Sequence, residues 1–183
     1  MFELSLHILD LVQNSISAGA KLVTIRIVID RGADRLTIVI MDDGCGMDEA
    51  LLKRVTSPFA TTRTTRKVGL GSPMFKQCAQ MCGGDFSIRS KPGEGTRLEA
   101  SFQWSHMDLP PMGDLADTMR TILVGAPDKP EFRLEYQADG RQFVFDTREV
   151  RQALGGLPFS SAEILDWIGG YIKEGLEQTD QNA

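Results

Sequence analysis

Two neighbouring stretches near the start of the chain alternate between apolar and polar residues. In residues 23–29 every second position is valine or isoleucine, and after a turn at residues 31–34 an apolar residue again stands at every second position, at Leu36, Ile38 and Ile40. A two-residue period is typical of a β-strand that buries one face. The pattern predicts a pair of adjacent strands, the second of which ends at Asp42.

The rest of the first hundred residues predicts helices and a second pair of strands. Apolar positions recur with helical spacing in three segments, and two more strand-like segments follow, joined by a tight turn that contains proline and glycine. Strands joined by tight turns form antiparallel pairs, so we expect an α+β sandwich: a mixed, mostly antiparallel sheet with helices on one face. The helical segments are residues 3–18, 49–55 and 72–82, and the strands are residues 85–90 and 96–104.

A composition break at Pro110-Pro111 separates a tail from this first part. The tail predicts a helix near residues 115–123, a hairpin near residues 132–145 and a last helix opened by a capping box at residues 160–163. It carries no chemical motif. We therefore predict two units, a domain that carries the chemistry and a small C-terminal α+β extension of unknown role, with bounds 1–105 and 106–183.

Composition narrows the function classes. The chain has 183 residues, 42% hydrophobic, with a formal net charge of -5, and this acidic balance argues against non-specific nucleic-acid binding. No stretch approaches the roughly 20 apolar residues of a membrane span, and the N-terminus lacks the basic and apolar regions of a secretory signal. We expect a cytoplasmic protein with no nucleic-acid or membrane partner, whose cysteines, Cys45, Cys78 and Cys82, are reduced.

The first predicted helix has a narrow polar stripe. Asp10 is the only charged residue between Leu4 and Ala20, and His7, Asp10 and Asn14 fall within about 60° of one another on a helical wheel. Three interpretations stay open: core hydrogen bonds satisfy the stripe, it faces solvent at an edge, or a carboxylate and a carboxamide one turn apart hold Mg²⁺ and a water.

The end of the second strand is a candidate base-binding site. Asp42 has the same parity as the apolar residues of its strand, so it projects from the covered face, where an exocyclic purine amine would be a suitable donor. Gly44 and Gly46, just before Met47, permit close backbone approach to a flat ligand. Thr96 opens the last strand on the same face. The alternatives are a solvated turn after Asp42 and a threonine chosen for its strand propensity.

A long, polar and basic loop covers residues 57–71. Its cationic side chains are candidate phosphate clamps, and the backbone N–H groups of the helix that follows Gly69-Leu70-Gly71 form a candidate anion site. No Walker phosphate-binding motif is present. The alternative is a solvated basic loop. The candidate clamps are Arg63, Arg66 and Lys67, with Thr62 among four threonines that could donate hydrogen bonds.

These pieces, in this order, resemble the GHKL ATPase superfamily, which contains gyrase, Hsp90, histidine kinases and MutL. Asp10 to Ala18 is similar to the superfamily's E-x-x-x-N-x-x-x-A helix motif, and the stretch from Asp42 to Gly46 is similar to its adenine-binding motif. Ser57 to Arg63 resembles the start of the ATP lid, Gly69-Leu70-Gly71 the second glycine motif, and Gly93 to Thr96 the late G-x-G-T. The resemblance covers about residues 3–104 and implies a Bergerat-type two-layer sandwich.

The resemblance also implies a set of site residues for ATP and Mg²⁺. It places Asp10 where the family has the glutamate that orients or deprotonates the attacking group, and Asn14 where the family binds Mg²⁺. Aspartate is one methylene shorter than glutamate, which puts direct general-base geometry in question. The implied ATP-binding residues are Asn14, Ala18, Asp42, Gly44, Gly46, Met47, Thr62, Arg63, Lys67, Gly69, Leu70, Gly71 and Thr96.

Three functions follow as hypotheses. Histidine kinases carry a phosphoacceptor hairpin before the ATP domain, whereas here the motifs begin at residue 3, and His106 lies beside Pro110-Pro111 and not on a helix. We predict a stand-alone kinase or phosphotransferase that acts on a separate protein, as anti-sigma-factor kinases do. The alternatives are a slow ATPase or ATP-gated interaction module, and a nucleotide sensor without turnover. The tail is a candidate surface for a protein partner or a homodimer.

Overall fold

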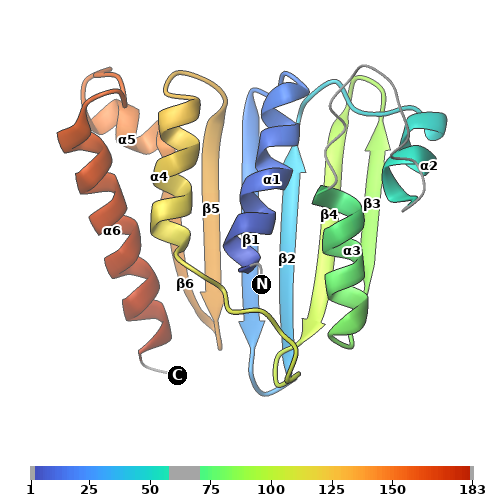
Figure 1. The fold of residues 1–183 in the computed structure, drawn as a ribbon. Coiled ribbons are helices and arrows are strands. Elements are labelled where there is room, and N and C mark those ends of the chain that lie inside the picture. The colour runs from blue at the N-terminus through green and yellow to red at the C-terminus, as the bar shows by residue number, and fades with distance from the viewer. Residues whose placement is uncertain (1–2, 58–70, 182–183) are drawn as a thin grey trace.

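A computed structural model describes residues 3–57 and 71–181, which form a single sheet covered by helices (Figure 1). The sheet has six strands in the order β3-β4-β2-β1-β5-β6, and β1 and β5 form its parallel pair while the other neighbours are antiparallel. The strands are β1 Leu22–Asp30, β2 Arg35–Asp42, β3 Phe86–Lys91, β4 Gly95–Gln103, β5 Glu131–Ala138 and β6 Arg141–Asp146.

The long helices lie on one face of this sheet, as Figure 1 shows for α1, α3, α4 and α6. The predicted α+β two-layer sandwich is therefore confirmed. Over the described residues, no helix has the length and apolar character needed to cross a membrane. The helices are α1 Leu4–Ser17, α2 Glu49–Thr56, α3 Gly71–Met81, α4 Leu115–Gly125, α5 Thr147–Ala153 and α6 Ala162–Asp180.

The two faces of the sheet differ in chemistry because side chains alternate along each strand. On β1, Val23, Ile25 and Ile27 are fully buried beneath the helices. The residues between them face the open side, where Arg26 pairs with Glu135 of β5. The apolar alternation seen in the sequence therefore marks the helix-covered face.

The tail continues the sheet of the first part. Strand β5 pairs with β1 over eight consecutive positions, from Leu22 opposite Glu131 to Ile29 opposite Ala138. Buried residues of both parts belong to one hydrophobic cluster. In the structure the two segments share one sheet and one core. The domain boundary between residues 105 and 106 stays a prediction from the sequence.

Two local features of the tail depart from the sequence analysis. Ser161 precedes α6 but its side chain makes no capping hydrogen bond, so the predicted capping box is wrong. Helix α5 is absent from the predicted elements; Asp146 caps it by accepting a hydrogen bond from the N–H of Arg148. The signal for α5 is weak because the helix has only seven residues and follows directly on a strand.

Asp146 gives the fold a pH-dependent contribution to stability. Its carboxylate is almost fully buried and accepts hydrogen bonds from Arg148 (Nη2, 2.7 Å) and Arg133 (Nη1, 3.2 Å). The Arg148 hydrogen bond, reinforced by Arg133, lowers the pKa of Asp146 from 3.8 to about 2. A carboxylate whose folded-state pKa is depressed stabilises the fold above its unfolded pKa, and this contribution is lost as pH falls toward the folded pKa.

We therefore expect Asp146→Asn to lower the free energy of unfolding at about pH 6 by on the order of 1–2 kcal/mol, a value discounted because Arg148 is half exposed. The gap between wild type and variant should shrink steadily between about pH 4 and pH 2. Urea denaturation followed by circular dichroism across this range measures both. A gap that stays constant with pH would contradict the assignment.

Candidate functional site

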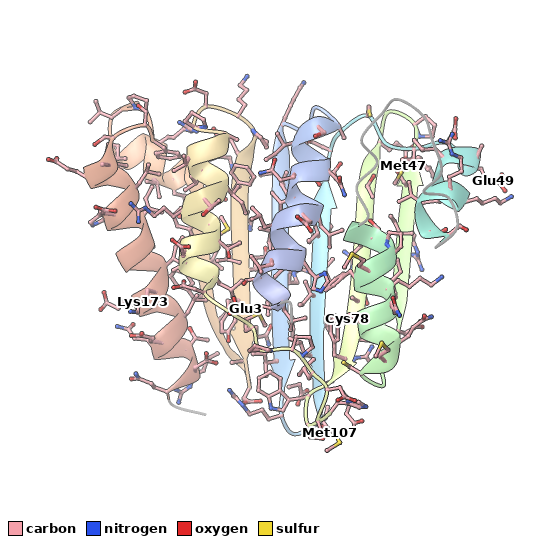
Figure 2. The ribbon with its side chains drawn as sticks, in the orientation of Figure 1. Glu3, Met47, Glu49, Cys78, Met107 and Lys173 are labelled. Atoms are coloured by element: carbon pink, nitrogen blue, oxygen red, sulfur yellow. The ribbon has the colours of Figure 1, made fainter. Side chains whose placement is uncertain are left out.

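A cavity of about 440 Å³ opens between α1, α2 and one end of strands β2, β3 and β4. Its walls are mostly apolar, with Ile40, Ile88 and Leu98 contributed by three adjacent strands. Figure 2 shows Met47, one of its lining residues, near the start of α2 at this end of the molecule. Six residues predicted from the sequence line the cavity together: Asn14, Ala18, Asp42, Gly46, Met47 and Thr96.

Asp42 is held in one orientation at the end of β2. Its Oδ2 accepts a hydrogen bond from Ser15 Oγ at 2.6 Å, and its Oδ1 accepts one from the backbone N–H of Gly44 at 2.9 Å. Thr96 lies directly opposite Asp42 in the register of β2 and β4. The parity argument from the sequence is thus correct, and the carboxylate faces the cavity.

Ser15 is a site residue that sequence reasoning missed. It occupies a core-facing position of α1 and is buried, as are Leu4, Ile8 and Leu11 of the same helix. A buried hydroxyl among apolar helix positions requires a hydrogen-bond partner. The position of Ser15 in the apolar pattern of the helix could therefore have indicated, from the sequence, that it has such a partner. The partner, Asp42, could not be identified without knowing how α1 crosses the sheet.

The loop after β2 is fixed to its surroundings by backbone contacts. The N–H of Cys45 donates to the carbonyl of Ala18 at 2.9 Å, and the N–H of Gly93 donates to the carbonyl of Cys45 at 2.8 Å. A Cβ on Gly44 would lie 2.9 Å from the Cβ of Ala18, so the loop and the end of α1 approach as closely as glycine allows. This contact explains why small residues occupy both positions.

Asp43, next to the site, has a structural role. Its Oδ1 accepts hydrogen bonds from the backbone N–H groups of Lys21 (2.7 Å) and Leu22 (2.9 Å). The Leu22 hydrogen bond, with a smaller effect from Lys21, holds the pKa of Asp43 below its ordinary value. Asp43 thereby ties the loop to the start of β1, while Asp42 faces the cavity.

Ser90 is a second residue that the sequence analysis missed. It lies opposite Thr96 in the register of β3 and β4. Its Oγ lies 2.9 Å from Thr96 Oγ1 and accepts a hydrogen bond from the N–H of Met47 at 2.8 Å. Ser90 therefore joins the loop after β2 to the strand that carries Thr96, and only the register of the sheet reveals this.

The polar stripe of α1 divides between the cavity and its surroundings. Asn14 lines the cavity, whereas Asp10 is exposed and lies outside the set of lining residues. Gly71, the first residue of α3, packs beside Asp10, since a Cβ there would lie 3.3 Å from the Cβ of Asp10. His7 is buried against Phe75, and this burial lowers the pKa of His7, an effect that the Asp10 carboxylate opposes.

Most of the predicted phosphate-binding residues lie outside the described residues. Among residues 3–57 and 71–181, no group of three or more histidine, cysteine, aspartate or glutamate side chains could hold a metal ion. The predicted residues outside the described part are Thr62, Arg63, Arg66, Lys67, Gly69 and Leu70.

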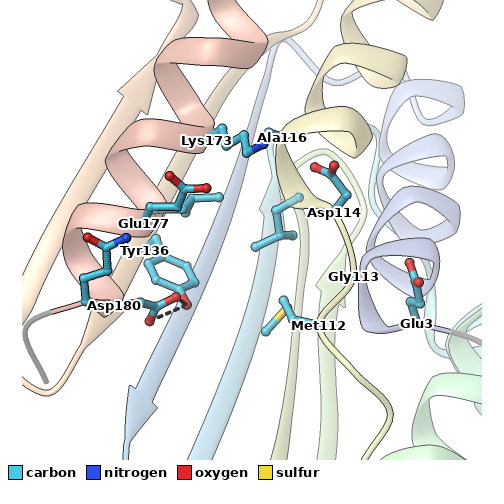
Figure 3. Close-up of a pocket in the computed structure, with 12 residues that line it drawn as sticks. Glu3, Met112, Gly113, Asp114, Ala116, Tyr136, Lys173, Glu177 and Asp180 are labelled. Carbon is cyan, nitrogen blue, oxygen red and sulfur yellow. Dashed lines mark hydrogen bonds between the residues drawn. The ribbon is translucent and has the colours of Figure 1, made fainter.

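A second cavity, of about 530 Å³, lies between α4 and α6 and is shown in Figure 3. Four of its lining residues carry carboxylates, against one cation, Lys173: Glu3, Asp114, Glu177 and Asp180. The Tyr136 hydroxyl donates to Asp180, and burial, followed by the Asp180 charge, raises the pKa of Tyr136. This surplus of negative charge makes the second cavity unfavourable for a nucleoside triphosphate.

Comparison with known proteins agrees with this geometry. Residues 3–106 match the family model described as histidine kinase-, DNA gyrase B- and HSP90-like ATPase. The sensor protein DegM of Bacillus sp. (strain B21-2) is 33% identical over 94 residues, which cover 51% of this chain and 25% of DegM. The sensor protein kinase FleS of Pseudomonas aeruginosa is 39% identical over 89 residues, which cover 49% of this chain and 22% of FleS. The chain thus spans a quarter or less of these two relatives.

Solved structures support the fold over a larger share of the chain. The MutL ATPase domain of Aquifex aeolicus, complexed with ADP, superimposes with a TM-score of 0.52 at 14% identity, covering 81% of this chain and 67% of that domain. The N-terminal domain of a DNA repair protein superimposes with a TM-score of 0.53 at 16% identity, covering 79% of this chain and 52% of that one. At these identities the likeness concerns the fold alone.

The loop after β2 and the β3–β4 turn that contacts it each contain a glycine whose substitution we expect to have a different effect. Gly46 and Gly93 both have positive φ, +66° and +77°, but a Cβ on Gly46 would overlap the carbonyl of Lys91, whereas nothing lies within 4 Å of one on Gly93. We expect Gly93→Ala to cost about 1–2 kcal/mol of unfolding free energy, and Gly46→Ala about 3 kcal/mol or more. Urea denaturation of both variants measures this, and equal costs would refute the proposed crowding at Gly46.

Proposed function

Because the chain belongs to the family of histidine kinase-, DNA gyrase B- and HSP90-like ATPases, we propose that it binds ATP with the adenine ring in the cavity beside Asp42. The observation that carries this proposal is the Asp42 carboxylate, which Ser15 and Gly44 hold toward an apolar cavity. A fixed carboxylate in apolar surroundings is suited to accept a hydrogen bond from an exocyclic amine.

The size and lining of the cavity fit a purine. Ligand pockets have volumes of roughly 300–1,000 Å³ and are mostly apolar with a few polar groups that fix orientation. This cavity, of about 440 Å³, has Ile40, Ile88 and Leu98 as apolar walls, and Asp42 and Thr96 as neighbouring polar groups. The apolar walls would contact the faces of the base, and the polar groups would fix its edge.

Asn14 is the residue proposed to hold Mg²⁺. It lines the same cavity as Asp42, one helical turn after Asp10. Mg²⁺ in nucleotide sites keeps several waters and takes only one or two protein ligands besides the phosphates, so a single carboxamide oxygen is adequate. When bound, Mg²⁺ would neutralise charge on the phosphates. The resemblance assigns the phosphates themselves to Thr62, Arg63, Lys67 and the glycine motif that ends at Gly71.

The proposed activity is transfer of the terminal phosphate of ATP to a protein acceptor. The support is the similarity to proteins named as a sensor protein and a sensor protein kinase. An alternative is a slow ATPase or ATP-gated interaction module, because Asp10 is one methylene shorter than the glutamate that the resemblance implies there. In either case a protein partner, or a second copy of the chain, would read the nucleotide state.

The two activities differ in where the phosphate goes. Proteins that co-purify with the chain would be incubated with it and ATP labelled at the terminal phosphate. Label on a protein supports transfer, and label released as free phosphate supports hydrolysis. Tight ATP binding with neither product would instead indicate a sensor and would contradict both enzymatic proposals.

Asp42→Asn should weaken ATP binding at least tenfold, because the variant replaces a charged acceptor with a neutral amide. Titration calorimetry measures the Kd. Asp43→Asn is the matched control: its amide oxygen can still accept from Lys21 and Leu22, and the residue does not line the cavity. Unchanged affinity in Asp42→Asn, or equal losses in both variants, would count against the proposed adenine site.

Asn14→Ala should remove most of the Mg²⁺ dependence of ATP binding and leave the circular dichroism spectrum unchanged. The neighbouring Gln13→Ala is the control, since Gln13 is exposed and outside the cavity lining. The measurement is the ratio of the ATP Kd without and with Mg²⁺. If that ratio is the same in Asn14→Ala as in wild type, Asn14 does not hold the ion.

A further inference from the structure

Three polar residues form a row across adjacent strands at the end of the sheet. Asp42 of β2 lies opposite Thr96 of β4, and Thr96 lies opposite Ser90 of β3. Asp42 and Thr96 line the cavity, whereas Ser90 does not. Ser90 is therefore one strand away from a ligand in this cavity and can act on it only through lining residues that it contacts, Thr96 by its side chain and Met47 by its backbone N–H.

The contacts of Ser90 determine where its single hydroxyl hydrogen points. Ser90 Oγ accepts from the N–H of Met47, lies 2.9 Å from the carbonyl oxygen of Gly95, and lies 2.9 Å from Thr96 Oγ1. A carbonyl oxygen has no hydrogen, so its contact is a hydrogen bond only if Ser90 donates to it. The Thr96 contact is then a hydrogen bond only if Thr96 donates to Ser90.

With this assignment all three contacts of Ser90 Oγ are hydrogen bonds, and the hydroxyl hydrogen of Thr96 is used in the bond to Ser90. A serine hydroxyl offers one donor and two acceptor lone pairs, and Gly95, Met47 and Thr96 use all three. Thr96 Oγ1 consequently presents only lone pairs to the cavity. Asp42, as a carboxylate, also presents only acceptors.

We propose that Ser90 is a positioning residue that fixes Thr96 as an acceptor and so makes the cavity select 6-aminopurine over 6-oxopurine nucleotides. This inference rests on the proposed binding of ATP in the same cavity. The exocyclic amine of adenine has two N–H donors for the neighbouring acceptors Asp42 and Thr96. A 6-oxopurine places a carbonyl oxygen there, and acceptors facing an acceptor leave buried groups unpaired.

Removal of the Ser90 hydroxyl frees the Thr96 hydrogen to turn toward the cavity and donate to a 6-oxo group. We expect Ser90→Ala to lower the ratio of the inosine triphosphate Kd to the ATP Kd by about tenfold relative to wild type. Ser90→Thr, which keeps the hydroxyl, should restore the wild-type ratio. Ser87→Ala is the matched control, since Ser87 is an exposed serine on the same strand but on its other face.

Calorimetry of the full chain with each nucleotide and Mg²⁺ gives these ratios. In a Thr96→Val background, Ser90→Ala should no longer change the ratio, because the group through which it acts is missing. If Ser90→Ala does not fold, Ser90→Cys makes the same test, since a thiol is a weak donor and acceptor.

The outcomes separate this inference from the proposed function. Wild type that binds neither nucleotide overturns both. Wild type that binds ATP, with an unchanged Kd ratio in Ser90→Ala, leaves ATP binding in place and overturns the positioning role. A lowered ratio that persists in the Thr96→Val background also overturns it, because Ser90 would then act by another route.

Discussion

A carboxylate that faces the covered side of a sheet is the constraint around which the site is arranged. Transfer of an unpaired carboxylate from water into apolar surroundings costs several kcal/mol, so Asp42 requires donors at fixed positions. Ser15 supplies one from α1, and the N–H of Gly44 supplies the other from the loop that follows β2. Because Ser15 precedes Asp42 by 27 residues, the orientation of Asp42 requires α1 to cross the sheet where it does. The remaining acceptor capacity of the carboxylate is directed at the cavity.

The position of α1 depends in turn on the sheet beneath it. Strand β1 lies between β2 and β5, and its apolar residues are buried beneath the helices. The tail contributes to this environment, because β5 pairs with β1 and α4 packs against α1. The segment without a chemical motif therefore has a physical role at the site: it completes the core that supports the helix carrying Asn14 and Ser15.

Periodicity and parity predicted much of this arrangement from the sequence. Both patterns are local, so they located the strands and placed Asp42 and Thr96 on one face without knowledge of the fold. Ser15 and Ser90 were missed because their roles depend on contacts between separate elements, the crossing of α1 over β2 and the register of β3 against β4. The parallel pairing of β1 with β5 was missed for the same reason, since its cross-strand ion pair joins residues 109 positions apart.

The residues proposed for base recognition and those proposed for phosphate chemistry have different structural supports in this molecule. Asp42, Thr96 and Ser90 occupy one cross-strand row, where the backbone register fixes their spacing and leaves little freedom for any one of them to move alone. Asp10 and Asn14 instead lie one turn apart on α1, and of these two only Asn14 reaches the cavity lining. A sheet register changes only by a slip that moves side chains to the opposite face, whereas an exposed helix position tolerates a change of side chain. If the chain binds ATP as proposed, a shortened acid at residue 10 alters turnover while nucleotide recognition at the sheet stays intact.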